Sequence, residues 1–279
     1  MNDQVIHVAH SPDSDDAFMF YALATGAMDT GGLQFVHELK DIESLNQDAK
    51  QGRYEVTAVS IHAYAYLADR YALLDSGASM GEGYGPVLVA REPLGVERIS
   101  SLLVAVPGER TSALLALKLL EPDLRYRVID FDRIIPAVQA GEVDAGLIIH
   151  EGQLLYESLG LHCVVDLGRW WNQGTGLPLP LGGNVIRRDL GTERIHQVSR
   201  LLKESIRYAL EHRDEALDYA LSYGRGLERR QGDQFVGMYV NQRTLSYGEE
   251  GRRAVRLFLE RGYSAGLIPR RPDIEFVTC

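Results

Sequence analysis

The sequence is short of cysteine, of positive charge and of long apolar segments, and each shortage excludes a class of protein. Only two cysteines occur in 279 residues, so we expect neither a disulfide framework nor a metal site built from clustered thiolates. A formal net charge of -10 argues against nucleic-acid and membrane partners, since both need a basic surface. No apolar run reaches the length of about 18 residues that predicts a membrane helix, and no secretory leader is evident, so we expect a cytoplasmic protein.

Motifs of cofactor sites are missing as well. The chain contains no Gly-x-Gly-x-x-Gly and no Gly-Lys-Ser/Thr string, which argues against nucleotide binding. The eight histidines form no compact ligand motif with cysteine or carboxylate, although His10, His62 and His150 could still converge in space. We therefore expect neither a metal ion nor an organic cofactor. A Ser-His-Asp hydrolase is a further possibility that we do not favour.

Periodic patterns in the first two-thirds of the chain predict alternating strands and helices. The first strand-helix pairs are Val5–Ala9 with Asp16–Met28, Leu33–Leu39 with Ile42–Gln51, and Glu55–Ser60 with Ile61–Leu67. After Pro86–Ala90 the rhythm restarts, with elements at Leu102–Val106, Thr111–Leu120, Arg125–Phe131, Arg133–Ala140, Ala145–His150 and Cys163–Leu167. The restart predicts a second sheet.

From Arg194 onward, apolar residues at helical spacing predict a helical region that returns to the first sheet. We therefore expect an α/β protein of two lobes with a ligand cleft between them. Residues 1–91 plus 187–279 are predicted to form the larger lobe, and residues 92–186 the smaller one. The chain would cross between the lobes around Val89–Pro93 and around Asn184–Arg188.

His150 is the most informative residue for function. The apolar run Ala145–Ile149 ends in this imidazole where a helix is expected to begin. Small-molecule sites of α/β proteins gather beyond the carboxyl ends of strands, so the position suits a catalytic base. A neutral histidine that is buried and bonded to a neighbouring carbonyl is the alternative interpretation.

The first strand-to-helix junction, His10–Asp16, is rich in hydroxyls and carboxylates. Its side chains could cap the following helix, or Ser11, Ser14 or Asp15 could face a substrate hydroxyl. Three carboxylates make the loop a poor cradle for phosphate.

Other strand ends and helix starts carry hydroxyls without the carboxylates of the first loop. Thr111 and Ser112 open a predicted helix, where hydroxyl and amide donors suit a carboxylate, although an ordinary helix cap would look the same. Ser60 ends a strand in the first lobe. If the lobes close on each other, these groups and His150 would surround one cleft, and a base there could speed proton transfer by about 10²–10⁴-fold.

Over nearly its whole length the chain resembles the menaquinone-biosynthesis proteins related to 1,4-dihydroxy-6-naphthoate synthase of the futalosine route. The motifs that carry the resemblance are Ser11-Pro-x-x-x-Asp16-x-Phe18-x-Phe20, Gly81-x-Gly83-x-Gly85-Pro86, Val106-Pro-Gly108 followed by Thr111, Gly141–Glu151 and Thr175–Gly182. The resemblance implies a bilobed α/β fold similar to type II periplasmic binding proteins, with two mixed sheets flanked by helices. It also implies an enzyme of the cytoplasm.

The resemblance further implies a carbon–carbon lyase that acts on cyclic dehypoxanthine futalosine and needs no metal or organic cofactor. It makes His150 the general base, places Ser60, Thr111 and Ser112 at the ligand, and draws Ser11, Asp15 and Asp16 into the site. The family's first loop commonly reads Ser-Pro-Cys-Pro-Asn-Asp, whereas this chain has Ser11-Pro-Asp-Ser-Asp-Asp16. The added acidity leaves a related substrate open.

Two other functions stay open at this point. One is a binding protein for a small carboxylate without catalysis, which the two-lobe pattern alone would allow. The other is the sibling chorismate dehydratase, for which the Gly-Leu-Ile-Ile-His150-Glu string is not expected. The sequence leaves the oligomeric state undetermined.

Overall fold

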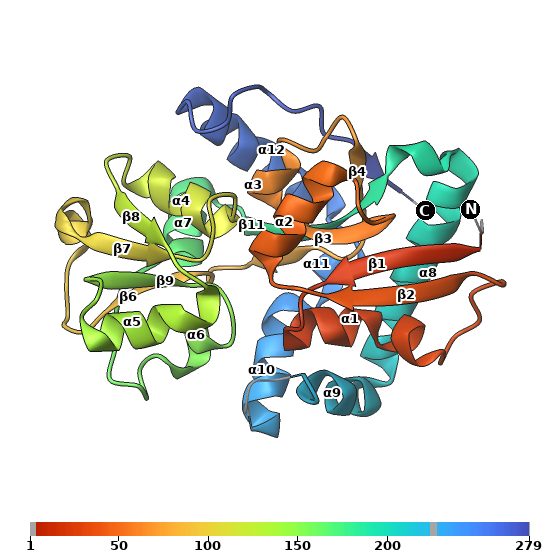
Figure 1. Ribbon diagram of the computed structural model, residues 1–279, viewed down its shortest axis with the longest axis horizontal. Helices are drawn as coiled ribbons and strands as arrows, with labels where there is room; N and C mark the ends of the chain where they lie inside the picture. The colour runs from red at the N-terminus through yellow and green to blue at the C-terminus, as the bar shows by residue number, and fades with distance from the viewer. Residues whose placement is uncertain (1–3, 224–227, 279) are drawn as a thin grey trace.

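A computed structural model describes residues 4–223 and 228–278 and contains two mixed sheets (Figure 1). The larger sheet has seven strands in the described residues, in the order β12-β4-β11-β3-β1-β2, with β5 beside β11. Its strands are β1 (Val5–His10), β2 (Gln34–Leu39), β3 (Val56–Ser60), β4 (Tyr71–Leu74), β5 (Ser79–Gly81), β11 (Leu179–Arg187) and β12 (Phe276–Val277). β1 pairs in parallel with β2 and β3, whereas β11 is antiparallel to β3, β4 and β5.

The smaller sheet has five strands in the described residues, in the order β10-β6-β9-β7-β8. They are β6 (Val87–Ala90), β7 (Leu103–Val106), β8 (Arg125–Val128), β9 (Ala145–Ile148) and β10 (His162–Asp166). β7 is parallel to β8 and β9, and β6 is antiparallel to β9 and β10. We call each sheet with the helices that cover it a lobe.

Helices cover both faces of each sheet (Figure 1). The larger lobe carries α1 (Ser14–Thr25), α2 (Ile42–Gln51), α3 (Ile61–Tyr64), α8 (Thr192–Glu211), α9 (Arg213–Leu221), α10 (Arg229–Tyr239), α11 (Gln242–Leu245) and α12 (Gly248–Ser264). The smaller lobe carries α4 (Ser112–Leu120), α5 (Ile134–Ala140), α6 (Gly152–Leu155) and α7 (Leu167–Thr175). Short 3-10 turns lie at Val96–Ser101, Phe131–Arg133 and Arg188–Leu190.

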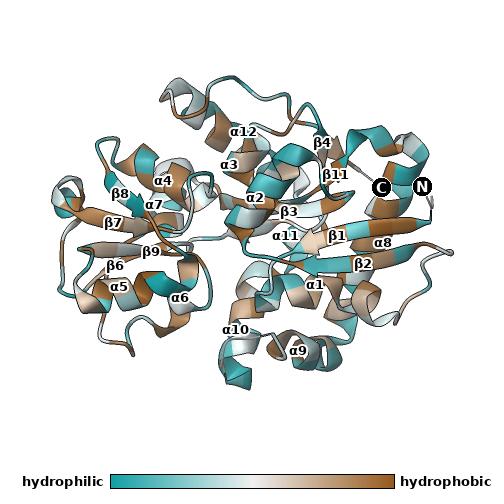
Figure 2. Cartoon of the chain, in the orientation of Figure 1, coloured by the Kyte–Doolittle hydropathy of each residue, from teal (hydrophilic) through white to brown (hydrophobic). Residues whose placement is uncertain are grey.

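The apolar patterns explain why these segments form strands and helices. All five residues of β3 are buried, as expected of a strand covered on both faces. In α8 the residues Val198, Leu201, Leu202 and Ile206 are buried, which is the face that their spacing predicts. Figure 2 shows the same division, with hydrophobic colour along most strands and hydrophilic colour on outward parts of the helices.

Two strands lie in a different sheet from the one that the predicted lobe limits give. The limits at 91/92 and 186/187 put β6 in the larger lobe and most of β11 in the smaller one, whereas β6 pairs in the smaller sheet and β11 runs through the larger sheet. The chain therefore leaves the larger sheet before β6 and returns to it before β11. An apolar run is equally compatible with the last strand of one sheet and the first strand of the next. Periodicity therefore could not decide to which sheet β6 and β11 belong.

The first crossing is packed backbone against backbone on the start of α7. The amide of Leu167 donates to the carbonyl of Pro86, at 2.9 Å. A Cβ atom at Gly168 would lie 1.8 Å from the carbonyl oxygen of Tyr84, so only glycine allows this approach. The first crossing therefore lies directly against the start of α7, which leads into the second.

One hydrophobic cluster extends across both lobes. It contains Val59 and Ile61 from the larger lobe, Leu88 and Leu147 from the smaller sheet, and Trp171 of α7. The Trp171 ring meets the ring of Phe258 in α12 edge-on, with centroids 5.3 Å apart, and its Nε1 donates to the carbonyl of Pro178. The lobes thus share part of their core behind the crossings.

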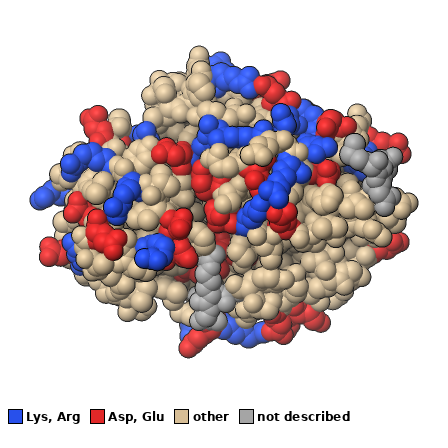
Figure 3. Space-filling view, viewed as in Figure 1, with Lys and Arg blue, Asp and Glu red and all other residues tan. Residues whose placement is uncertain are grey.

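Two observations concern the surface. On the face seen in Figure 3, Lys and Arg side chains are interspersed with Asp and Glu, without a broad basic area. Within the described residues, no helix combines the length and the apolar character needed to cross a membrane. The expected absence of nucleic-acid and membrane partners stays a prediction.

We expect Trp171→Ala to lower the free energy of unfolding by about 3–5 kcal/mol, because a large ring is lost from the core shared by the lobes. The adjacent Trp170→Ala is the matched control and should cost clearly less, since the Trp170 side chain is only partly buried. Urea unfolding followed by circular dichroism gives both values. Equal losses in the two variants would contradict the shared core.

Candidate active site

A single cavity at the junction of the lobes collects all six side chains that the sequence assigns to substrate binding. These are Ser11, Asp15, Asp16, Ser60, Thr111 and Ser112. The first four come from the larger lobe, beyond the carboxyl ends of β1 and β3, and the last two from the start of α4 in the smaller lobe. A ligand held there would contact both lobes.

Ser60 is fixed by a buried asparagine that the sequence analysis did not single out. The Nδ2 of Asn46, in α2, donates to the Ser60 hydroxyl at 3.1 Å, and the Ser60 amide donates to its Oδ1 at 2.9 Å. Because the Ser60 oxygen already accepts a bond, its own O–H can point into the cavity. A polar residue on the sheet-facing side of an amphipathic helix was the available signal for Asn46.

The first loop is folded around its own carboxylates. The amide of Ser11 donates to Oδ2 of Asp16 at 2.8 Å, and the Ser11 hydroxyl accepts from the amide of Asp13 at 3.0 Å. α1 begins at Ser14, two residues before the predicted start, and the N-cap residue Asp13 makes no side-chain cap bond. Of the two interpretations of this loop, capping by its own side chain is thus not seen at Asp13, and Glu151 of the other lobe accepts from Ser14 at the start of α1.

Two carboxyls of this loop resist ionisation. Burial raises the pKa of Asp16 to about 6, partly offset by its hydrogen bonds from Ser11. Burial, and then the negative charges of Asp16, Asp13 and Glu151, raises the pKa of Asp15 well above its usual value. This wall of the cavity therefore takes up protons at a higher pH than free carboxyls do.

The opposite wall is the first turn of α4. The Thr111 hydroxyl caps the helix by accepting from the amide of Leu114 at 3.2 Å and donates to the carbonyl of Gly108 at 3.1 Å. The Ser112 hydroxyl donates to the carbonyl of Leu181 at 2.5 Å and accepts from the amide of His62. The two hydroxyl hydrogens are therefore directed to the protein in this arrangement, and the backbone N–H groups that open the helix are the donors that remain for a ligand.

His150 does not line the cavity; its neighbour Ile149 does. Its Nδ1 accepts from the amide of Gly152 at 3.1 Å, and its Nε2 lies 3.4 Å from the carbonyl oxygen of Phe131. The Phe131 ring meets the imidazole edge-on, with centroids 5.2 Å apart. The expectation that the ring faces the cleft is not met here, because the chain turns after β9 so that Ile149 faces the ligand space.

The other two histidines lie apart from this one. His10 stacks on Phe20 with centroids 4.4 Å apart, and its Nε2 lies 3.1 Å from Nδ1 of His37. Burial, and then the charge of the neighbouring His37, lowers the pKa of His10 to about 3. The Nδ1 of His62 lies 3.2 Å from the carbonyl oxygen of Thr111.

One motif escaped the sequence analysis. Gly77-Ala-Ser79-Met-Gly81 fits the Gly-x-Ser-x-Gly pattern of a hydrolase nucleophile, and Ser79 lines the cavity. That pattern needs a sharp turn from a strand into a helix, whereas Ser79 opens β5 and pairs with Gly182 of β11. The local backbone therefore does not support a nucleophilic serine.

The lobes are joined directly beside His150. Oε1 of Glu151 accepts from the hydroxyl of Ser14 at 2.9 Å and from its amide at 3.3 Å, so this carboxylate of the smaller lobe receives the first donors of α1. The hydroxyl of Tyr239 in α10, which lines the cavity, donates to Oε1 of Gln153 at 2.7 Å. These contacts join residues 86 or more positions apart in the sequence, so no local sequence pattern predicts them.

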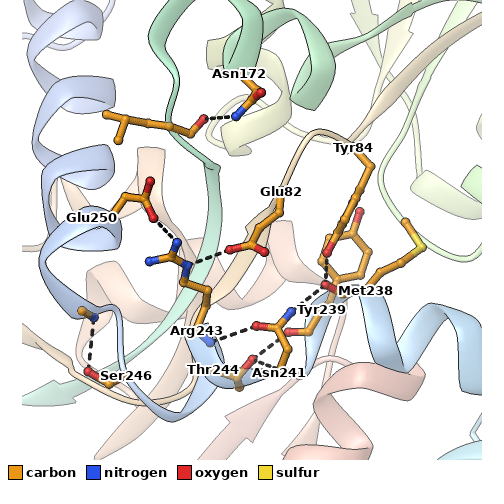
Figure 4. Close-up of polar contacts among 12 residues, drawn as sticks. Glu82, Tyr84, Asn172, Met238, Tyr239, Asn241, Arg243, Thr244, Ser246 and Glu250 are labelled. Carbon is orange, nitrogen blue, oxygen red and sulfur yellow. Dashed lines mark hydrogen bonds and ion pairs between the residues drawn. The ribbon is translucent and has the colours of Figure 1, made fainter.

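The first crossing supports the α10 wall of the cavity (Figure 4). The Tyr84 hydroxyl donates to the carbonyl of Met238, and its ring meets Tyr239 edge-on with centroids 5.7 Å apart. Nearby, Arg243 donates from Nε to Glu82 at 2.7 Å and also pairs with Glu250. The crossing is thus tied to α10, α11 and α12 together.

Comparison with solved structures shows the fold. A protein of Archaeoglobus fulgidus is 48% identical and superposes with a TM-score of 0.92, covering 96% of this chain and 100% of its own. The alkanesulfonate-binding protein SsuA of Xanthomonas axonopodis pv. citri is 12% identical but superposes with a TM-score of 0.75, covering 98% and 99%. The protein therefore has the fold of periplasmic binding proteins, as the sequence resemblance implies.

Comparison with curated sequences shows the family. A protein of Thermus thermophilus named 1,4-dihydroxy-6-naphthoate synthase is 44% identical over 98% of this chain and 100% of its own. A protein of the same name from Streptomyces coelicolor is 34% identical over 96% of each chain. The family model described as menaquinone biosynthesis matches residues 6–264. With a match over most of its length, this chain belongs to the menaquinone-biosynthesis family.

Proposed function

We propose that the protein is a 1,4-dihydroxy-6-naphthoate synthase, a cytoplasmic carbon–carbon lyase that acts on cyclic dehypoxanthine futalosine. The observation that carries the proposal is the cavity between the lobes, where hydroxyls and the first turn of α4 face a wall of carboxyls. Two curated relatives with this name cover almost the whole chain and support it.

The binding step uses the polarity of the two walls. The N–H groups of Ser112 and Ala113 open α4, and Ala113 also lines the cavity, so this end suits the substrate carboxylate. The Ser60 hydroxyl lies on the larger-lobe side and can donate to a second oxygen. Binding from both lobes favours closure around the substrate and excludes water.

In the chemical step His150 removes a proton from a substrate hydroxyl. As that O–H bond breaks, its electron pair forms a carbonyl, the adjacent carbon–carbon bond breaks, and the naphthoate ring fragment keeps the pair until it is protonated. A three-carbon fragment is released. Because the ring of His150 contacts Gly152 and Phe131 instead of lining the cavity, we expect it to turn toward the substrate on binding.

The position of His150 also favours a second candidate, a protein that binds a small carboxylate without changing it. The cavity as described is lined by binding groups and excludes the imidazole. Chorismate dehydratase activity, the third possibility, is tested by offering chorismate to the protein alongside cyclic dehypoxanthine futalosine.

We expect the purified protein to release 1,4-dihydroxy-6-naphthoate from cyclic dehypoxanthine futalosine and to leave chorismate unchanged, as measured by absorbance and mass spectrometry. His150→Ala should lower kcat by about 10²–10⁴-fold while ligand binding is kept, because it removes the base and no cavity-lining group. His162→Ala, at an exposed histidine of the same lobe, is the control. Binding of substrate without turnover by the wild type would favour the binding protein, and full activity of His150→Ala would exclude the assigned base.

Ser60→Ala should weaken substrate binding by about 0.5–1.5 kcal/mol, because one hydroxyl donor to the ligand is lost. Calorimetric titration with the product, 1,4-dihydroxy-6-naphthoate, measures this change without turnover. Ser101→Ala, at an exposed serine outside the cavity, should bind as the wild type does. A Ser60 variant of unchanged affinity would remove this hydroxyl from the binding site.

The acidic wall predicts that an anionic ligand binds less tightly as the pH rises. Below the raised pKa values, Asp15 and Asp16 are neutral; above about 6, Asp16 ionises and repels the ligand carboxylate. Asp16→Asn should therefore reduce the loss of product affinity between about pH 5.5 and about pH 8, whereas Asp123→Asn, at an exposed position, should not. An affinity of the wild type that is independent of pH would contradict this role of the wall.

A further inference from the structure

Glu151 is a buried carboxylate whose two oxygens have different surroundings. Its side chain is 3% exposed. Oε1 accepts both hydrogen bonds from Ser14 across the lobe junction. Oε2 is buried and has no hydrogen-bond partner within the described residues. A buried oxygen without a partner is unfavourable, so a donor is expected to reach it at some stage of function.

The imidazole of His150 is the group in place to do so. Its Nδ1 lies 3.9 Å from Oε2 of Glu151, beyond hydrogen-bond range but close enough for a small rotation to bridge. In the present arrangement Nδ1 accepts from the amide of Gly152 and therefore carries no proton. When the ring takes up a proton, both nitrogens become donors, and Nδ1–H needs an acceptor that Gly152 N–H cannot supply.

We propose that Glu151 is a positioning residue, which accepts Nδ1–H of His150 when the imidazole is protonated and which Ser14 fixes in place when the lobes are closed. This inference rests on the proposed function in taking His150 as the base. For Nε2 to accept the substrate proton, the neutral ring must carry its own proton on Nδ1, and Oε2 of Glu151 favours this tautomer by accepting Nδ1–H. The transfer then gives an imidazolium, and the Glu151 carboxylate balances its charge without taking a proton itself. Glu151 would thus stabilise the product of the proton transfer.

The larger lobe holds the segment Glu151–Gln153, which follows His150, at both of its ends. Ser14 holds Glu151 at the start of α1, and Tyr239 holds Gln153 from α10. Both bonds require the lobes to be close together. Closure around a substrate therefore also sets the carboxylate beside the imidazole, so that the base is supported only when the cleft is shut.

The other titratable groups that face Glu151 come from α1 and the loop before it. Asp15 interacts directly with the charge of Glu151, and Asp13 and Asp16 belong to the same cluster. Burial and these three neighbours raise the pKa of Asp15, which therefore gives up its proton late. A neutral Asp15 limits the repulsion on Glu151 and leaves its charge for His150.

The test measures the titration of His150 directly, by NMR of the full-length protein labelled in its histidines, with His150→Gln used to assign the signal. In Glu151→Gln the Ser14 bonds can persist, but the charge and the acceptor beside Nδ1 are lost, so the His150 pKa should fall by about one unit or more. Ser14→Ala should shift it in the same direction by less. Glu157→Gln, an exposed glutamate of the same lobe, should leave it unchanged.

A His150 titration that is the same in wild type and Glu151→Gln would overturn the proposal. If Glu151→Gln does not fold, as judged by circular dichroism, Ser14→Ala carries the test, and an unshifted titration there counts against it. The NMR result is independent of substrate, so it stands even if cyclic dehypoxanthine futalosine is not turned over, in which case the proposed function alone fails.

Where the wild type is active, kinetics give a second readout. Glu151→Gln should lower kcat by about tenfold or more with a smaller change in KM, and the acid limb of the kcat profile should move to lower pH. A lower kcat with an unmoved acid limb would show a structural role instead and would refute the positioning role.

Discussion

The close approach of Gly168 to the carbonyl of Tyr84 is the constraint on which the arrangement of the lobes depends. It holds the first crossing against the start of α7, with β6 in the smaller sheet and β11 in the larger one. From that geometry the carboxyl ends of β1 and β3 and the start of α4 face each other. A larger side chain at position 168 would push the start of α7 away from the first crossing.

The two walls are electrostatically unlike, and this difference gives the cavity its chemical character. The first turn of α4 offers backbone donors, whereas the first loop offers carboxyls that hold protons to an unusual pH. A ligand with a carboxylate at one end and hydroxyls at the other would complement these walls, with its carboxylate at α4 and its hydroxyls at the first loop. The same fold occurs in the alkanesulfonate-binding protein SsuA, so the fold alone does not separate binding from catalysis.

The sequence predicted features that depend on local chemistry. The apolar runs that became β1, β3 and β9 are regular, and hydroxyls at strand ends and helix starts marked Ser11, Ser60 and Thr111. It did not predict contacts made by residues distant in the chain. Asn46 and Glu151 act through partners 14 and 137 positions away, and the direction of the His150 ring depends on a turn that periodicity does not describe.

The hydrophobic cluster shared by the lobes has a further consequence for cooperativity. Trp171 and Phe258 come from different lobes, and the cluster continues through both sheets, so the lobes share part of their core in addition to the cluster that each has of its own. Domains that share a core lose much of their stability when one of them melts. Melting of one lobe would therefore expose apolar surface of the other, which favours denaturation of the protein in one step.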